Sequence, residues 1–271
     1  MSSSGTDRIL VFIPAYRCAA QITRVIDQFD AQVRRRIDTV MVVDNRSPDD
    51  TLEAAIAQAR ARITGCQFIA WRNDDNYGLG GSHKAAFRYA IEHGYTHLVV
   101  LHGDDQADIR DLLPLLDSGA HRDHDCLLGA RFMPGSRLVG YSLTRSWGNR
   151  VFNLLFSLAV RGRVRDLGSG LNMYRLKAFE QFYYLTFPDD LTFNYMMLLS
   201  SYARRHRIRY FPISWREEDQ LSNVRMVSQS FRVLGLLASF MIDRTRFLAR
   251  DVRERVRAAY PGTIVHRHGA E

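Results

Sequence analysis

The sequence lacks any apolar run that approaches the roughly 18 residues needed to span a bilayer. Its two most apolar stretches, residues 151–160 and 233–242, are shorter than that and are flanked by arginine. The first seven residues are polar and contain no apolar signal core. We therefore expect a chain that does not cross a membrane by itself.

Cysteine is also scarce in this sequence. Only Cys18, Cys66 and Cys126 occur in 271 residues, and they lack the spacing of metal ligands. We interpret them as reduced thiols of a cytosolic protein. No internal repeat or low-complexity linker is visible, so the length suits one large domain or a domain with a tail.

Acidic residues are outnumbered by basic ones, 29 against 37, which gives a formal net charge of +8. This balance suits an anionic partner, such as nucleic acid, an anionic membrane surface or a phosphorylated substrate. The arginines cluster late in the chain, and no helix-turn-helix, zinc or RNA-binding signature is present. We therefore expect no nucleic-acid partner.

The first half of the chain alternates short apolar runs with helix-like segments. We predict strands at residues 9–13, 39–43, 66–71 and 97–101, and helices at residues 19–35, 49–62 and 82–93. Continuous apolar strands separated by helices are typical of a parallel sheet that is covered on both faces. Ligands of such sheets bind in the loops at the carboxyl ends of the strands.

The second half is less regular. We predict helices at residues 109–116, 143–160, 191–205 and 228–250, and strands at residues 126–130 and 207–213. The last twenty or so residues are charged, and we expect them to be poorly ordered. This pattern indicates a main domain at residues 1–225, followed at 226–271 by an amphipathic helix and a charged tail.

Polar side chains stand at the ends of three predicted strands. Asp44 and Asn45 follow the second strand and are suited to bind a nucleobase or ribose, or alternatively to shape a turn. The glycine-rich segment 76–81 follows the third strand, either to approach a phosphate or to form a tight turn and helix cap. His102, Asp104 and Gln106 follow the fourth strand and are a candidate Mg²⁺ or Mn²⁺ site, or alternatively a solvated acidic loop.

In their order and spacing, these segments resemble family 2 glycosyltransferases of the GT-A fold, in the branch of dolichol-phosphate mannose synthase-like, polyprenyl-phosphate sugar transferases. The resemblance runs from about residue 9 to residue 225. It rests on residues 12–16, 42–47, 50–51, 76–80, 101–106, 129–132, 166–175, 212–216 and 222–223.

The resemblance implies an α/β, Rossmann-like GT-A fold with a mostly parallel central sheet, helices on both faces and C-terminal amphipathic helices. It also implies roles for individual residues. The nucleotide sugar is bound by Pro14, Tyr16, Asp44, Asn45, Asp104 and Arg225; the metal by His102, Asp104 and Gln106; and the catalytic set is Asp104, Arg131 and Arg216. Arg131 matches a basic residue near the acceptor phosphate.

Two departures from the family pattern stand out. The usual Asp-x-Asp at the metal site begins here with His102, which suits Mn²⁺ better than Mg²⁺. The usual Arg-x-x-Gly-x-Ser-Lys stretch is replaced by residues 216–225, without the glycine. Either Arg216 or Arg225 is therefore left as the residue that meets phosphate.

The expected reaction is metal-assisted, inverting transfer of a sugar from a UDP- or GDP-linked donor to a polyprenyl phosphate. An ionised acceptor phosphate needs no general base, whereas a hydroxyl acceptor requires one, for which Asp189 and Asp190 are the candidates. Apolar residues bracketed by arginines at 141–165 and 231–250 suit helices on an anionic membrane surface, or helices packed on the core. We expect a peripheral protein on the cytoplasmic face of the membrane.

Two alternatives remain open. One is a glycosyltransferase that acts on a saccharide hydroxyl in surface-polysaccharide synthesis. The other is a non-catalytic sugar-nucleotide-binding protein, which the histidine at position 102 keeps in play.

Overall fold

The computed structural model describes residues 6–217 and 226–269, and its centre is one eight-stranded sheet. In chain order its strands are β1 (Ile9–Ala15), β2 (Thr39–Asp44), β3 (Gln67–Asn73), β4 (His97–Leu101), β5 (Cys126–Ala130), β7 (Leu171–Arg175), β8 (Ile208–Pro212) and β10 (Gly262–His268). Two short strands, β6 (Arg137–Val139) and β9 (Ser214–Arg216), pair in parallel beside it.

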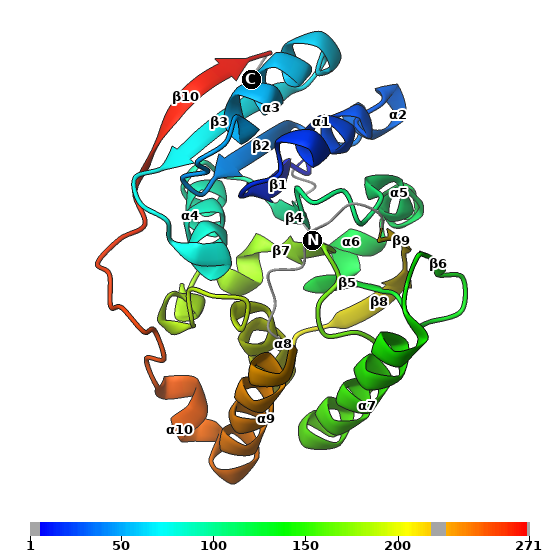
Figure 1. Ribbon diagram of the computed structural model, residues 1–271, viewed down its shortest axis with the longest axis vertical. Helices are drawn as coiled ribbons and strands as arrows, with labels where there is room; N and C mark the ends of the chain where they lie inside the picture. The colour runs from blue at the N-terminus through cyan, green and yellow to red at the C-terminus, as the bar shows by residue number, and fades with distance from the viewer. Residues whose placement is uncertain (1–5, 218–225, 270–271) are drawn as a thin grey trace.

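The strand order is β10-β3-β2-β1-β4-β7-β5-β8 (Figure 1). β1 lies between β2 and β4 and is parallel to both. β3 is parallel to β2, and β8 is parallel to β5. Only β7 and β10 run antiparallel to their neighbours. The prediction of a mostly parallel sheet is therefore confirmed, and the carboxyl ends of β2, β1 and β4 meet at one edge.

The helices flank this sheet on both faces (Figure 1). They are α1 (Ala19–Asp27), α2 (Ala31–Arg34), α3 (Thr51–Arg62), α4 (Gly78–Glu92), α5 (Leu113–Asp117), α6 (Ala120–Asp123), α7 (Leu143–Val160), α8 (Phe193–Ala203), α9 (Met226–Ile242) and α10 (Arg244–Ala249). Short 3₁₀ turns cover Ile109–Leu112, Leu176–Phe179 and Tyr183–Thr186. None of the helices within the described ranges has the length and apolar character that crossing a bilayer requires.

Alternate side chains of the buried strands belong to two separate cores. Val11 and Ile13 of β1 pack in the core that α1 and α3 cover, whereas Leu10 and Phe12 pack in the core that α4 and α8 cover. All four side chains are fully buried, and each contributes about 1.5–3 kcal/mol by leaving water. Two-sided burial explains why the sequence shows continuous apolar runs here instead of alternation.

Two predicted helices are divided in the structure. The segment 19–35 forms α1 and α2, because Asp30 accepts hydrogen bonds from the backbone of Gln32 and Val33 and starts a new helix. The segment 228–250 is divided at Asp243, which caps α10 through the backbone N–H of Arg246. In each case a short carboxylate competes with helix continuation for a backbone donor.

The prediction of disorder for the last twenty residues is wrong for β10. This strand pairs antiparallel with β3 at the edge of the sheet, and its side chains alternate between half-buried and exposed. An edge strand pairs with a neighbour on one side only, so its charged side chains stay in water. The antiparallel strand β7, between β4 and β5, was also absent from the sequence prediction.

Candidate active site

The tips of β2, β1 and β4 are joined by two backbone hydrogen bonds. The N–H of Asn45 donates to the carbonyl of Ala15 at 3.0 Å, and the N–H of Gly103 donates to the carbonyl of Pro14 at 3.2 Å. A Cβ at position 103 would lie 3.0 Å from the same Pro14 oxygen, so glycine permits this approach. Asp44 and Asp104 therefore stand on either side of the end of β1.

Asp44 lies at the end of β2 with its side chain fully buried. One carboxylate oxygen accepts from the backbone N–H of Ser47 at 3.1 Å, which shapes the turn. The other accepts from Nε of Arg72 at 3.3 Å, across the register pair of β2 and β3. The turn-shaping alternative thus describes part of what Asp44 does, and the half-exposed Arg72 brings a positive charge to the same edge.

Asn45 connects β2 to the segment after β3. Its amide oxygen accepts from the side chain of Asn73 at 3.0 Å and from the backbone N–H of Tyr77 at 2.8 Å. Its amide nitrogen donates to the side chain of Asn76 at 2.8 Å.

Tyr16, beyond β1, is 39% exposed and lies under the guanidinium of Arg17.

The charged centre of the β4 tip is Asp105, which the sequence analysis did not single out. Its carboxylate is buried and accepts from Arg24 at 2.8 Å, Gln28 at 2.9 Å and Arg216 at 2.7 Å. Arg216 also donates to the backbone carbonyl of Asp105 at 2.8 Å. Asp105 has a φ of 59°, in the left-handed region that residues other than glycine seldom adopt.

His102 and Asp104 are held close to this centre. The backbone N–H of His102 donates to the carbonyl of Gly170 at 2.9 Å, and a Cβ at position 170 would lie 3.2 Å from the histidine side chain. Burial lowers the pKa of His102, which keeps its imidazole neutral, and raises the pKa of Asp104. Nε2 of His102 is buried and has no hydrogen-bond partner within the described part of the chain.

His102 and Asp104 are suitable ligands for a divalent cation whose remaining ligands are substrate phosphates. Across residues 6–217 and 226–269, no three His, Cys, Asp or Glu side chains come together as a metal site. A neutral imidazole with an unused nitrogen and one carboxylate are nevertheless suitable donors, with Gln106 two residues further on. Mg²⁺ is commonly held by one or two protein carboxylates plus substrate phosphates.

Arg131 is placed in a buried ion pair. Its guanidinium donates two hydrogen bonds of 2.8 Å to the carboxylate of Asp166, and it lies over the rings of Tyr141 and Trp215. The guanidinium holds the pKa of Asp166 below its usual value against the effect of burial. The role of Arg131 at an acceptor phosphate stays a prediction. Arg225 lies outside the described residues.

The glycine-rich segment is the first turn of α4, which begins at Gly78 and not at the predicted position 82. The carbonyl of Asp189 accepts from the backbone N–H of Gly80 at 2.7 Å and caps the helix. A Cβ at Gly80 would lie 2.4 Å from the carbonyl oxygen of Pro188. The glycines therefore admit a neighbouring loop whose carbonyl caps the helix.

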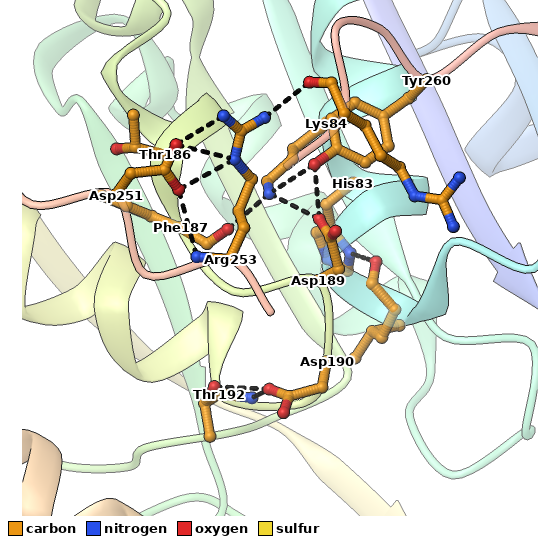
Figure 2. Close-up of polar contacts among 12 residues, drawn as sticks. His83, Lys84, Thr186, Phe187, Asp189, Asp190, Thr192, Asp251, Arg253 and Tyr260 are labelled. Atoms are coloured by element: carbon orange, nitrogen blue, oxygen red, sulfur yellow. Dashed lines mark hydrogen bonds and ion pairs between the residues drawn. The ribbon is translucent and has the colours of Figure 1, made fainter. Parts of the chain in front are cut away.

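That loop is held by a buried lysine, as Figure 2 shows. Nζ of Lys84 lies 2.6 Å from the carboxylate of Asp189 and 3.0 Å from the hydroxyl of Tyr260, and it also donates to the carbonyl of Phe187. The Tyr260 hydroxyl donates to the same Asp189 oxygen at 2.7 Å. Asp189 is thus already engaged by two donors.

The neighbouring Asp190 is engaged as well. It accepts hydrogen bonds from the backbone and the hydroxyl of Thr192 at the start of α8, and it pairs with Arg232 at 3.0 Å. Both candidate general bases therefore have structural partners. The N-cap residue of α8 is Thr192, without a side-chain cap, so Asp190 shapes the turn before the helix and does not cap it.

Comparison with known proteins gives a consistent family. The model of the family described as Glycosyl transferase family 2 matches residues 10–183. The undecaprenyl-phosphate mannosyltransferase of Micrococcus luteus is 29% identical over 172 residues, which cover 62% of this chain and 66% of that protein. The polyprenol monophosphomannose synthase of Mycolicibacterium smegmatis is 25% identical over 182 residues, which cover 65% and 64%. The chain thus matches slightly less than two thirds of the length of these curated relatives.

Solved structures share the fold at low sequence identity. The glucosyl-3-phosphoglycerate synthase of Mycobacterium tuberculosis, in complex with UDP, has a TM-score of 0.60 at 18% identity and covers 86% of this chain and 80% of its own. Residues 1–349 of TarS from S. aureus, in complex with UDP-GlcNAc, have a TM-score of 0.58 at 18% identity, with coverages of 89% and 70%.

Proposed function

The chain belongs to glycosyl transferase family 2, and on that premise we propose that it transfers a sugar from a nucleotide-sugar donor to a polyprenyl phosphate at a membrane surface. The names of the two curated relatives, a polyprenyl-phosphate and a polyprenol mannose transferase, support the acceptor class. The solved neighbours in complex with UDP or UDP-GlcNAc support the donor class.

The observation that carries this proposal is the shared sheet edge. The two hydrogen bonds to Pro14 and Ala15 bring the loops of Asp44 and Asp104 to the same strand end. In parallel α/β sheets this is where ligands bind. We propose that Pro14, Tyr16, Asp44 and Asn45 surround the nucleoside, with the β4 tip beside the diphosphate.

We propose that Asp104 and His102, with Gln106 nearby, would hold a divalent cation, Mg²⁺ or Mn²⁺. Bound there, the ion would neutralise charge on the diphosphate as it leaves. One solved neighbour was crystallised with Mn²⁺ and UDP-glucose. The unpaired Nε2 of His102 supports Mn²⁺, because imidazole is a better ligand for Mn²⁺ than for Mg²⁺.

The engagement of Asp189 and Asp190 favours a phosphate acceptor over a hydroxyl acceptor. A hydroxyl needs a base within hydrogen-bond reach, whereas a phosphate monoester is already ionised near neutral pH. We propose direct displacement: an acceptor phosphate oxygen forms a bond to the anomeric carbon, the bond to the diphosphate oxygen breaks, and configuration inverts. Arg216 and Arg72 supply positive charge at this edge.

Exposed apolar side chains support a peripheral position on a membrane. Trp147, Leu154 and Leu158 of α7 are between 60% and 72% exposed, and Phe231 of α9 is 71% exposed. α7 and α9 pack against each other, so these side chains can share one surface. We propose that this surface rests on the cytoplasmic face of the membrane.

The decisive experiment measures sugar transfer with UDP- and GDP-linked donors and Mg²⁺ or Mn²⁺. We expect a labelled lipid product with a short-chain polyprenyl phosphate, and no product with the matching polyprenol. Transfer to a free saccharide without lipid would instead support the polysaccharide alternative. Binding of a nucleotide sugar with neither transfer nor metal-dependent hydrolysis would support the non-catalytic one.

A further inference from the structure

An open groove of about 960 Å³ lies where the C-terminal ends of α7 and α8 meet α10. Arginine dominates its lining: Arg161 follows α7, Arg204 and Arg205 follow α8, and Arg244 begins α10. Among the residues that the structure describes, none that lines the groove is acidic. This is a concentration of positive charge at a place that the proposed reaction does not use.

Three of these guanidinium groups have no carboxylate partner among the described residues. In the part of the chain that the structure describes, Arg161, Arg205 and Arg244 form no ion pair, and all three are exposed. Two of the four guanidinium groups also lie over aromatic rings: that of Arg204 is 3.7 Å from the centre of the Tyr183 ring, and that of Arg244 is 5.1 Å from the centre of the Phe240 ring. The nearest acid along the chain, Asp243, is occupied as the cap of α10.

Stabilisation of helix ends explains only part of this cluster. A cation at a helix C-terminus interacts favourably with the helix dipole, which accounts for one arginine after α7 and one after α8. Arg244 is instead the first residue of α10, where a positive charge is unfavourable for the dipole. Arg244 and one of the two arginines after α8 are left without an explanation from the helix dipoles and without an acidic partner among the described residues. We take them as evidence for an anionic ligand.

The groove lies away from the proposed active site. α8 begins beside the loop of Asp189 and ends near Cys126, at the opposite edge of the sheet from the tips of β1 and β4. Its 11 residues span about 16 Å at 1.5 Å per residue. The groove is therefore distinct from a site for the reacting phosphate.

The surroundings of the groove identify the ligand as a lipid rather than a soluble anion. Leu158, near the end of α7, is 65% exposed, and Met241 and Ile242 at the end of α9 are 63% and 85% exposed. Figure 1 shows the C-terminal ends of α7 and α9 at the same end of the molecule. Exposed apolar side chains beside unpaired arginines match the boundary between acyl chains and phosphate headgroups.

We propose that this groove binds the phosphate-bearing headgroup of an anionic membrane lipid that is not the acceptor. The inference rests on the proposed membrane position and adds a specific contact to it. With the headgroup held between α7 and α10, the exposed stripe of α7 lies along the bilayer, and the active site is oriented at a fixed height.

The test is co-sedimentation of the full chain with phosphatidylcholine vesicles that contain phosphatidylglycerol. The variant Arg161→Gln/Arg244→Gln removes one guanidinium from each wall of the groove. We expect its vesicle affinity to fall about 30-fold, at roughly fivefold for each arginine near the surface. The matched control, Arg35→Gln/Arg60→Gln, removes two exposed arginines, one just after α2 and one in α3. Its vesicle affinity should fall by about twofold or less, because charges beyond about 10 Å are screened.

Three results would overturn the proposal. Equal losses in the two double variants would mean that net charge, and not this groove, drives binding. Equal binding to pure phosphatidylcholine would exclude an anionic headgroup. A rise in melting temperature with millimolar inorganic phosphate, in the absence of vesicles and dependent on Arg161 and Arg244, would identify a soluble anion as the ligand.

Transfer activity is measured separately on the same proteins with a short-chain acceptor in detergent. The groove variant should retain it, since neither arginine belongs to the proposed active site. If the wild-type chain binds vesicles through the groove but transfers no sugar, then the proposed function fails and this inference stands. Arg205→Gln, a single exposed change, gives an independent variant with an expected loss of about fivefold.

Discussion

The ammonium group of Lys84 lies 2.6 Å from the carboxylate of Asp189, and the lysine side chain is completely shielded from solvent. The pair joins the second turn of α4 to the loop before α8. Burial lowers the pKa of this lysine to about 8, and Asp189 opposes that change. Asp189 therefore stabilises the charged form of the lysine at a position that water does not reach.

Lys84→Met should destabilise the protein by about 3 kcal/mol, because it leaves Asp189 without its cation. Asp189→Asn in the Lys84→Met background should add little further loss, because the uncompensated carboxylate is then removed. The measurement is urea unfolding of the wild type, both single variants and the double variant. Lys177→Met, at the exposed second lysine, is the control and should change stability by less than about 0.5 kcal/mol. Additive losses in the cycle would show that the two groups do not interact.

Gly80→Ala should lower the melting temperature, because its Cβ would lie 2.4 Å from the carbonyl of Pro188 and 2.8 Å from Cβ of Phe193. We expect a loss of about 1–3 kcal/mol, as for other overpacked sites. Gly148→Ala, in α7, is the matched control, since nothing lies within 4 Å of its new methyl group. That change should stabilise the protein by about 0.5–1 kcal/mol. Similar effects at both positions would contradict the packing account of the glycine-rich segment.

Acid should destabilise the protein through His83. This ring is buried against Phe12, Phe193 and His102, and burial lowers its pKa from 6.5 to about 3. Between these values the unfolded chain binds a proton that the native chain does not, so stability falls as pH drops below 6.5. The contribution is about 1.4 kcal/mol for each pH unit in this window. His83→Phe should flatten the stability profile between pH 4 and pH 6.5 by that amount, whereas parallel profiles for variant and wild type would reject this assignment.

Asp104→Asn should reduce sugar transfer by about 100-fold or more. The amide would bind the divalent cation more weakly, and that cation would neutralise the charge of the leaving diphosphate. Its stability should be unchanged or higher, because burial already raises the pKa of this carboxyl and disfavours its charged form. Transfer rates and the metal-dependent thermal shift with the donor are measured together. Asp117→Asn, at an exposed carboxylate paired with Arg36, is the control. Near-wild-type turnover in Asp104→Asn would remove Asp104 from the proposed site.

Arg131→Ala should destabilise the protein by about 3–5 kcal/mol, as loss of one member of a buried ion pair does. Asp166→Ala should cost a similar amount by the same argument. If Arg131 also meets the acceptor phosphate, its variant should raise the KM for acceptor more than the KM for donor, beyond any change seen in Asp166→Ala. Equal kinetic parameters in the two variants would assign Arg131 to the ion pair alone.

The strands β1 to β4 were predictable because each carries a continuous apolar run. Parallel pairing then placed their polar C-terminal residues at one edge of the sheet. The start of α4 was not predictable, since glycines at positions 78, 80 and 81 disfavour a helix in isolation. The backbone N–H groups of Gly80 and Gly81 donate to the Asp189 carbonyl, which lies more than one hundred residues further along the chain. β10 was missed for a related reason, because its pairing with β3 outweighs its polar composition.

Local sequence thus determined the parallel α/β core, the edge where polar loops gather and the resemblance to a glycosyltransferase family, because these depend on side-chain periodicity and residue order. Tertiary structure alone decided that Asp105 meets Arg24 and Arg216, which acid pairs with Arg131, and where the unpaired arginines collect. Such choices depend on groups that meet only after distant segments pack. Short-range sequence patterns therefore do not predict these contacts.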